Sequence, residues 1–181
     1  IRDYPSRAVD EPSKEKSLRG AKDGFTETMM TNVALIRRRI RDNDLIFKAF
    51  VVGKTSKTDV CLAYMKGKAD KQIVDRISTH LEDLKLDTTT VGEQTVIEAL
   101  TKMQKRKNWL NPFPKVRYTQ RPDVVSAHVT EGKIALIIDN SPTVILIPAG
   151  IFDFIQDVDD YYFPVLTGNY FRLLRMLNTL V

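Results

Sequence analysis

An amphipathic stretch at residues 18–42 constrains the fold of this 181-residue chain more than any other feature. Placed about 100° apart, its apolar side chains fall on one narrow stripe, which predicts a helix of roughly four to five turns. The stripe consists of Phe25, Met29, Val33, Ile36 and Ile40. Asp23, Gly24 and Thr26 are expected to start the helix, and residues 42–44 to end it. Because such a stripe must be covered, the rest of the chain has to supply a facing layer.

Four arginines crowd the end of this predicted helix: Arg37, Arg38, Arg39 and Arg41. On the helical wheel the first and third flank the apolar stripe, whereas the other two point away from it. The run can therefore clamp neighbouring segments on both sides and still present charge to solvent. Three interpretations stay open: a solvated face that complements the helix dipole, bidentate contacts of some guanidiniums to carboxylates elsewhere in the chain, and contacts to nucleic acid.

Short apolar runs bounded by turn residues predict the strands. They are residues 45–52, 60–65, 116–119, 133–139 and 143–148. The first two runs are apolar on both faces apart from Lys48, so both read as buried strands joined by a turn. The last two are joined by Asp139-Asn-Ser-Pro142, a strong hairpin signal.

Helical patterns alternate with these strands. Asp70 is placed to cap a helix with a stripe of Ile73, Ile77, Leu81 and Leu84. Pro122 fits the first turn of another helix, which Gly132 closes. Further helices are predicted after a capping box at residues 90–93, at residues 151–155, and from Tyr170 onward. We therefore expect a mixed α+β (α/β) domain, a layered sheet flanked by helices.

Composition excludes several classes. The single cysteine, Cys61, rules out a disulfide framework within the chain and fits a reducing, cytosolic compartment. No apolar run approaches the roughly 18–20 residues of a spanning helix. Both ends look cut, which predicts a piece of a longer chain. The net charge of +5 is mild and local, but it leaves a nucleic-acid or anionic-lipid binding module open as the alternative function.

Catalytic chemistry has little support. His80 and His128 are isolated and give no metal-ligand spacing, so each is expected to be structural. Cys61 lies among apolar neighbours and should be an inert buried thiol. The acidic cluster at residues 153–160 lacks the Gly and terminal Glu of a calcium loop and reads as a solvated loop. We predict no catalytic residue, no metal site, no cofactor and no enzyme activity.

Four long motifs carry a resemblance to a known family. They are TMMTNVALIRRRIRD, GKTSKTDVCLAYM, NPFPKVRYTQRPDVV and IIDNSPTVILIPAGIFDF. In this order they resemble the GerA family of spore germination proteins, specifically the N-terminal region of the receptor A subunits. The opening of the chain matches too, so the resemblance runs from end to end. The third motif and the IIDNSP turn are closest to the stage V sporulation branch of the family.

The resemblance implies a fold context and a function. Family members carry two similar cytosolic α/β subdomains ahead of a membrane bundle in the spore inner membrane. This chain would then comprise a linker after the first subdomain (residues 1–24), a connecting amphipathic helix (25–44), the second subdomain (45–168) and a helix leading toward the membrane (169–181). Its expected role is non-enzymatic: assembly and signalling or ion release during germination. Expected partners are other receptor or channel subunits and further copies of the full-length protein, with no nucleic acid.

Eight charged residues are the candidates for interaction sites or structural ion pairs. The arginine run contributes four of them, Arg117 and Arg121 lie farther along the chain, and Asp59 and Asp123 are plausible carboxylate partners. The full set is Arg37, Arg38, Arg39, Arg41, Asp59, Arg117, Arg121 and Asp123.

Overall fold

A computed structural model describes residues 7–12, 15–16, 20–53, 57–83, 116–149 and 174. Within these residues one sheet holds the strands β1 (Leu45–Val52), β2 (Thr58–Met65), β3 (Arg117–Thr119), β4 (Ile134–Ile138) and β5 (Val144–Ile147). The helices are α1 (Met29–Arg39), α2 (Lys71–Asp83) and α4 (Pro122–Thr130). The strand order is β1-β2-β4-β5-β3, and every neighbouring pair is antiparallel. The mixed α+β prediction is confirmed.

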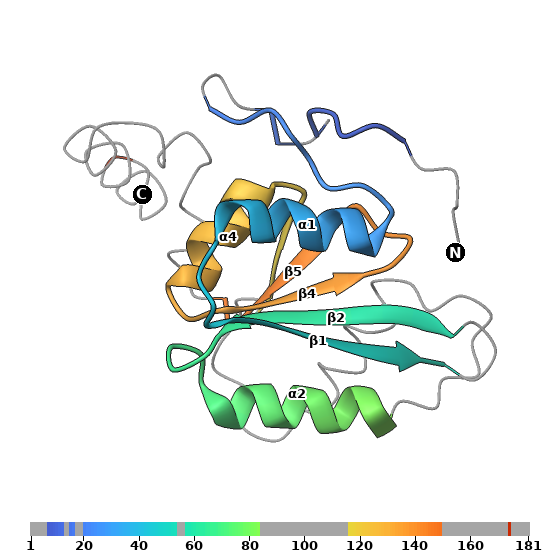
Figure 1. The fold of residues 1–181 in the computed structure, drawn as a ribbon, viewed down its shortest axis with the longest axis vertical. Helices are drawn as coiled ribbons and strands as arrows, with labels where there is room; N and C mark the ends of the chain where they lie inside the picture. The colour runs from blue at the N-terminus through green and yellow to red at the C-terminus, as the bar shows by residue number, and fades with distance from the viewer. Residues whose placement is uncertain are drawn as a thin grey trace.

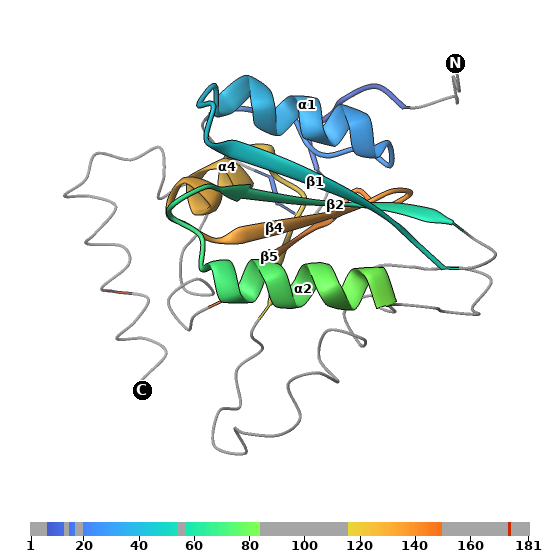
Figure 2. The same cartoon turned by 60° about the horizontal axis from the view of Figure 1, so that its bottom comes forward.

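The sheet lies between two helical layers. α1 and α4 cover one face and α2 covers the other (Figure 1), and a second view shows the same three layers (Figure 2). Because successive strand residues point to opposite faces, the buried apolar side chains form two separate cores. Ile36, Ile137 and Leu146 belong to the core under α1 and α4. Ile77 and Leu136 belong to the core under α2.

The first helix is shorter than the sequence predicts. It begins at Met29, so the predicted start at residues 23–26 is wrong. Buried Asn32 explains the difference, because its Oδ1 accepts the Thr26 amide at 2.8 Å and its Nδ2 donates to the Thr26 carbonyl at 2.6 Å. These bonds take the backbone groups that a helix would use. The true start is capped from across the fold, where the Met29 amide donates to Asp139 Oδ1 at 2.9 Å.

Other local signals are confirmed. Asp70 Oδ1 accepts the Gln72 amide at 2.8 Å, which caps the start of α2. Pro122 opens α4, and Gly132, with a φ of +100°, follows it. The hairpin turn between β4 and β5 uses Asn140 at a φ of 65°, a conformation that Asn tolerates better than most residues.

The segment before α1 runs over the surface of the domain in an extended path (Figure 1). The Gly24 amide donates to the Asp10 carbonyl at 2.9 Å, and the Phe25 amide to the Gln120 carbonyl at 2.9 Å. A side chain at Gly24 would lie 2.8 Å from that Asp10 oxygen and 2.9 Å from Cδ of Pro12, so the two stretches approach closely. Phe25, only 1% exposed, still fills the core predicted for it, although it lies outside the helix.

Several predicted features lie outside the described residues. They are the capping box at 90–93 with its helix, the aromatic stretch at 109–115, the acidic cluster at 153–160, and the helices at 151–155 and 170–181, of which Leu174 alone is described as helical. Among the helices that are described, none has the length and apolar character needed to cross a membrane.

Candidate functional site

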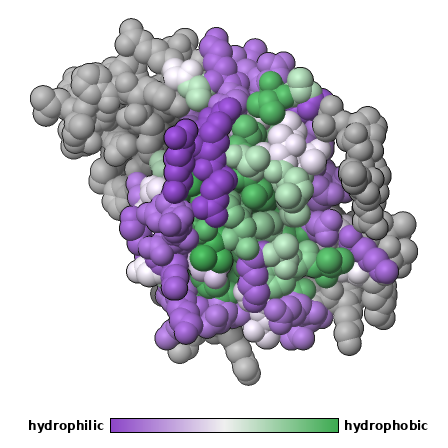
Figure 3. All heavy atoms as spheres, in the orientation of Figure 1, coloured by the Kyte–Doolittle hydropathy of each residue, from purple (hydrophilic) through white to green (hydrophobic). Residues whose placement is uncertain are grey.

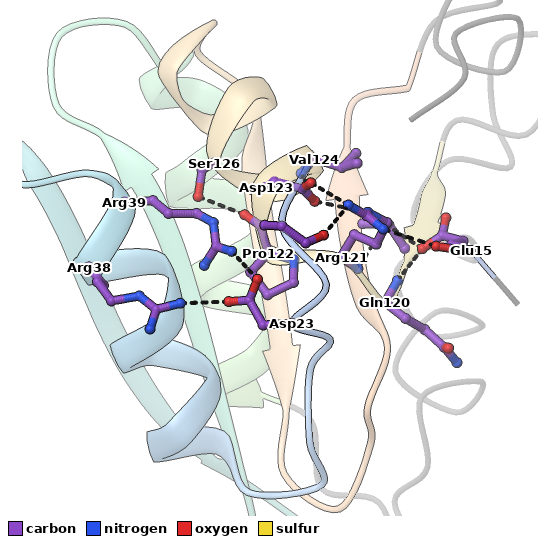
Figure 4. Close-up of polar contacts among 12 residues, drawn as sticks. Glu15, Asp23, Arg38, Arg39, Gln120, Arg121, Pro122, Asp123, Val124 and Ser126 are labelled. Atoms are coloured by element: carbon purple, nitrogen blue, oxygen red, sulfur yellow. Dashed lines mark hydrogen bonds and ion pairs between the residues drawn. The ribbon is translucent and has the colours of Figure 1, made fainter. Parts of the chain in front are cut away.

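One carboxylate gathers two members of the arginine run. Asp23 Oδ2 accepts Arg38 Nη2 at 2.7 Å, and Asp23 Oδ1 accepts Arg39 Nη2 in a short contact (Figure 4). The Arg39 side chain is 17% exposed and Asp23 is 16% exposed, whereas Arg38 is 62% exposed. Burial alone would raise the pKa of Asp23, but the hydrogen bond and charge of Arg39, helped by Arg38, hold that pKa below its usual value. Asp23 therefore ties the segment before α1 to the helix instead of capping it.

Arg37 has different partners from those the sequence suggested. Its Nη1 donates to the Asp42 carbonyl at 2.9 Å and its Nη2 to the Leu45 carbonyl at 2.8 Å. Its guanidinium also lies 5.0 Å from the centre of the Phe47 ring. Arg37 thus fastens the end of α1 to the start of β1 through backbone oxygens. Arg41 is exposed and makes a long contact, 3.4 Å, to the Arg38 carbonyl.

Arg121 is the most buried charged side chain of the candidates, with 0% exposure. It forms a two-pronged ion pair with Asp123, through Nε to Oδ1 at 3.1 Å and Nη2 to Oδ2 at 2.6 Å. It also donates to the Glu15 carbonyl at 3.1 Å (Figure 4). A further bond goes to the Ala21 carbonyl at 2.8 Å. A planar guanidinium satisfies four acceptors in this way, which an ammonium could not do.

Glu15, in the segment before α1, binds the residues that precede Arg121. Its Oε2 accepts the Gln120 amide at 2.7 Å (Figure 4) and the Thr119 hydroxyl at 2.8 Å. Both donors belong to the end of β3 or the residue after it, directly ahead of Arg121. The segment before α1 is therefore held to the β3–α4 junction by charge-assisted hydrogen bonds, which are stronger than neutral ones.

Arg117 lies beside a buried histidine. Its Nη1 is 3.2 Å from Nε2 of His128, and His128 Nδ1 is 3.1 Å from Glu131 Oε2. Because a guanidinium can only donate, Nε2 of His128 accepts, and Nδ1 carries the proton toward Glu131. Burial first, and then the positive charges of Lys133 and Arg117, lower the pKa of His128, against an opposing effect of Glu131. His128 is thus held neutral inside the fold.

Asp59 is not brought into the arginine networks. Its carbonyl accepts the Asp139 amide at 2.9 Å, and within the described part of the chain none of the candidate arginines pairs with its carboxylate. Sequence reasoning also missed Glu15 and Asn32 as organising residues. Neither has a local signal, because their partners are set by the fold; only the clustering of charge in the opening segment hinted at ion pairing.

The described residues offer little for catalysis or metal binding. No group of three or more His, Cys, Asp or Glu side chains among them is placed to hold a metal ion. Cys61 is buried, and burial raises the pKa of its thiol to about 11, so the thiolate is scarce at neutral pH. His80 lies half-buried on α2. The charged residues that the structure does bring together bind backbone, carboxylate and imidazole groups of the same chain.

Comparison with known proteins gives a consistent family. The model of the Bacillus/Clostridium GerA spore germination protein family matches residues 1–181. Stage V sporulation protein AF of Bacillus subtilis (strain 168) is 39% identical over 180 residues, which is 99% of this chain and 36% of that protein. Spore germination protein KA of the same organism is 35% identical over 171 residues, 94% of this chain and 30% of that protein. The chain thus spans about a third of the length of these curated relatives.

A solved structure resembles the fold as well. The N-terminal domain of the A subunit of the Bacillus megaterium spore germinant receptor GerK3 matches with a TM-score of 0.52 and 32% sequence identity, covering 71% of this chain and 97% of that one. The family match over the whole length, the two relatives and this structural likeness agree with one another. The chain belongs to the GerA family of spore germination proteins.

Proposed function

We propose that this chain is a non-enzymatic domain of a spore inner-membrane germination protein, located on the cytosolic side. It acts through protein contacts, in assembly and in signalling or ion release during germination. Its partners in this proposal are other germination receptor or channel subunits and further copies of the same protein. The membrane is reached through segments other than the described helices.

One observation supports this proposal over a nucleic-acid or anionic-lipid module. The arginines that raise the local charge are used inside the chain: Arg39 on Asp23, Arg37 on backbone carbonyls, and Arg121 on Asp123 and two carbonyls. Three arginines of the run, Arg37, Arg38 and Arg41, are exposed, but Arg37 already binds two backbone carbonyls and Arg38 already shares Asp23. A phosphate-binding surface needs several cations that remain available to the ligand.

Binding measurements test the proposal against its alternative. We expect this chain to bind DNA and anionic vesicles only weakly at physiological salt, without sequence preference. Sub-micromolar, sequence-selective DNA binding in a fluorescence anisotropy titration would replace the proposal with a nucleic-acid module. In the source organism, spores lacking the full-length protein should release ions and germinate more slowly after nutrient addition; normal kinetics with normal ion release would contradict the proposed role.

A further inference from the structure

A buried histidine joins α4 to the edge strand β3. His128 is fully buried, and Arg117 of β3 is 8% exposed. The Arg117 guanidinium donates to Nε2 of His128 at 3.2 Å, so this bond exists only while Nε2 carries no proton. Protonation of Nε2 would set a second donor against the guanidinium and place two cations in contact inside the fold. Because buried like charges are costly, the two side chains must separate when His128 takes up a proton.

The charges around His128 reinforce this conflict. Burial lowers the pKa of His128 most, and the positive charges of Lys133 and Arg117 lower it further. Glu131 opposes them through its hydrogen bond and its charge. The Glu131 side chain is 58% exposed, however, so solvent screens its attraction for a protonated ring.

The other charged groups on the elements packed against α4 lie elsewhere or are already bound, as far as the structure describes the chain. Asp59 lies at the start of β2, whereas the end of α4 is where the Lys68 ammonium donates to the Thr130 carbonyl at 3.0 Å. The bound groups are Arg37 on the Asp42 and Leu45 carbonyls, Arg38 and Arg39 on Asp23, and Asp123 on Arg121. Among the described carboxylates, Glu131 alone acts on His128.

β3 is the element that gives way when the two side chains separate. It has three residues, lies at the edge of the sheet and pairs with β5 alone. α4, by contrast, buries six of its nine residues and packs against α1 and the sheet. Short elements with few buried neighbours open at the lowest free energy.

β3 runs directly into the contacts that hold the segment before α1. Thr119, its last residue, and the Gln120 amide both donate to the Glu15 carboxylate. The Gln120 carbonyl accepts the Phe25 amide. These attachments are polar, and Figure 3 shows a mostly hydrophilic surface at the top, where Figure 1 places this segment. Displacement of β3 therefore loosens all three bonds together.

We propose that His128 and Arg117 form an acid-sensitive latch: proton uptake by His128 releases β3 and the segment before α1, while the central strands stay paired. This inference goes beyond the proposed function, because it describes a response of the domain itself that depends on no partner. The pKa of His128 is lowered in the folded chain, so the latch is closed at neutral pH. It opens as pH falls below about 6.5, the ordinary pKa of a histidine.

Hydrogen–deuterium exchange of this 181-residue chain at pH 7.5 and 5.5 tests the latch, with rates corrected for the intrinsic effect of pH. This range lies above the ordinary carboxylate pKa of about 4, so histidine is the side chain that titrates. We expect the amides of β3 and of residues 20–28 to exchange about five- to tenfold faster at pH 5.5. At that pH the amides of β2 and β4 should stay at least about tenfold better protected than those of β3.

Two glutamine variants separate His128 from other effects of pH. His128→Gln cannot take up the proton, so the acceleration in β3 should disappear. His80→Gln is the matched control and should keep the acceleration, because His80 lies on α2, on the other face of the sheet. An NMR titration of the unmutated chain adds a measurement that needs no variant, and the His128 ring should show a pKa below about 6.5.

Three outcomes would overturn the latch. One is an acceleration that persists in His128→Gln, and another is equal protection of β3 and the central strands, which would mean that the sheet opens as one unit. The third is a His128 pKa at or above about 6.5 in the unmutated chain, which decides the matter even if the glutamine variant does not fold. The germination and DNA-binding tests of the proposed function use different readouts, so these results leave them untouched.

Discussion

Replacing the buried arginine at the β3–α4 junction is the most informative perturbation of the fold. Arg121→Met keeps an apolar side chain of similar length but removes every hydrogen bond of the guanidinium. Asp123, 14% exposed, loses both of its contacts to Arg121, and the carbonyls of Glu15 and Ala21 lose the hydrogen bonds that Arg121 donates. Breaking a buried pair by removing one partner costs about 3–5 kcal/mol. Because Asp123 keeps slight access to water, we expect a loss near the lower end, about 3 kcal/mol.

Urea unfolding followed by circular dichroism measures this loss. Arg41→Met is the matched control, since Arg41 is exposed and has one long contact; it should change the free energy of unfolding by less than about 0.5 kcal/mol. In an Asp123→Asn background the effect of Arg121→Met should shrink, because a neutral amide that loses the Arg121 contacts costs less than a carboxylate that loses them. A loss below about 1 kcal/mol, or one equal to that of the control, would refute the view that Arg121 holds the opening segment.

Three further predictions concern the same networks. Asn32→Ala should cost about 2–3 kcal/mol in urea unfolding, since it leaves a buried backbone amide and carbonyl unpaired; a loss below about 1 kcal/mol would contradict this. Arg39→Ala should cost about 1–2 kcal/mol because it removes the better covered partner of half-buried Asp23. Arg38 is 62% exposed, so Arg38→Ala should cost less than about 0.5 kcal/mol; equal losses for the two variants would mean that both arginines lie on a solvated face. The pKa of His128 is lowered in the folded chain, so as pH falls the unfolded chain takes up a proton at this residue first. The free energy of unfolding should therefore decrease below about pH 6.5, by at most about 1.4 kcal/mol per pH unit. His128→Gln should flatten this pH dependence in melts from pH 7.5 to 5.

Local patterns in the sequence were sufficient for most of the described fold. The hairpin turn around Asn140, the cap at Asp70 and the opening proline of α4 each act within a few residues, so their effects are readable without the tertiary structure. The strand order could not be read in this way, because the pairing of β2 with β4 joins segments far apart in the chain. The predicted start of α1 was wrong for the same reason, because Asp139, which accepts the Met29 amide there, lies 110 residues away in the chain.

The candidate site shows the same division. Helical spacing grouped Arg37 with Arg39 at the flanks of the stripe, whereas in the structure Arg39 is 17% exposed and Arg37 is exposed, as Arg38 is. The spacing could not identify Asp23 as the carboxylate that Arg38 and Arg39 share. Asp123 was predicted as a plausible carboxylate partner, and the structure pairs it with Arg121, two residues away. Asp59 was predicted as a partner on charge alone, and the contact it makes in the structure is through its backbone carbonyl, which accepts the Asp139 amide. Charge indicates that a partner exists, whereas only the fold selects it.

Purification of the full-length protein from spore inner membranes tests the central claim most directly. The protein, extracted in detergent and identified together with its co-purifying components by mass spectrometry, should be recovered from the membrane fraction with other germination receptor or channel subunits. Recovery from the soluble spore fraction in association with nucleic acid, and without any germination subunit, would contradict the account.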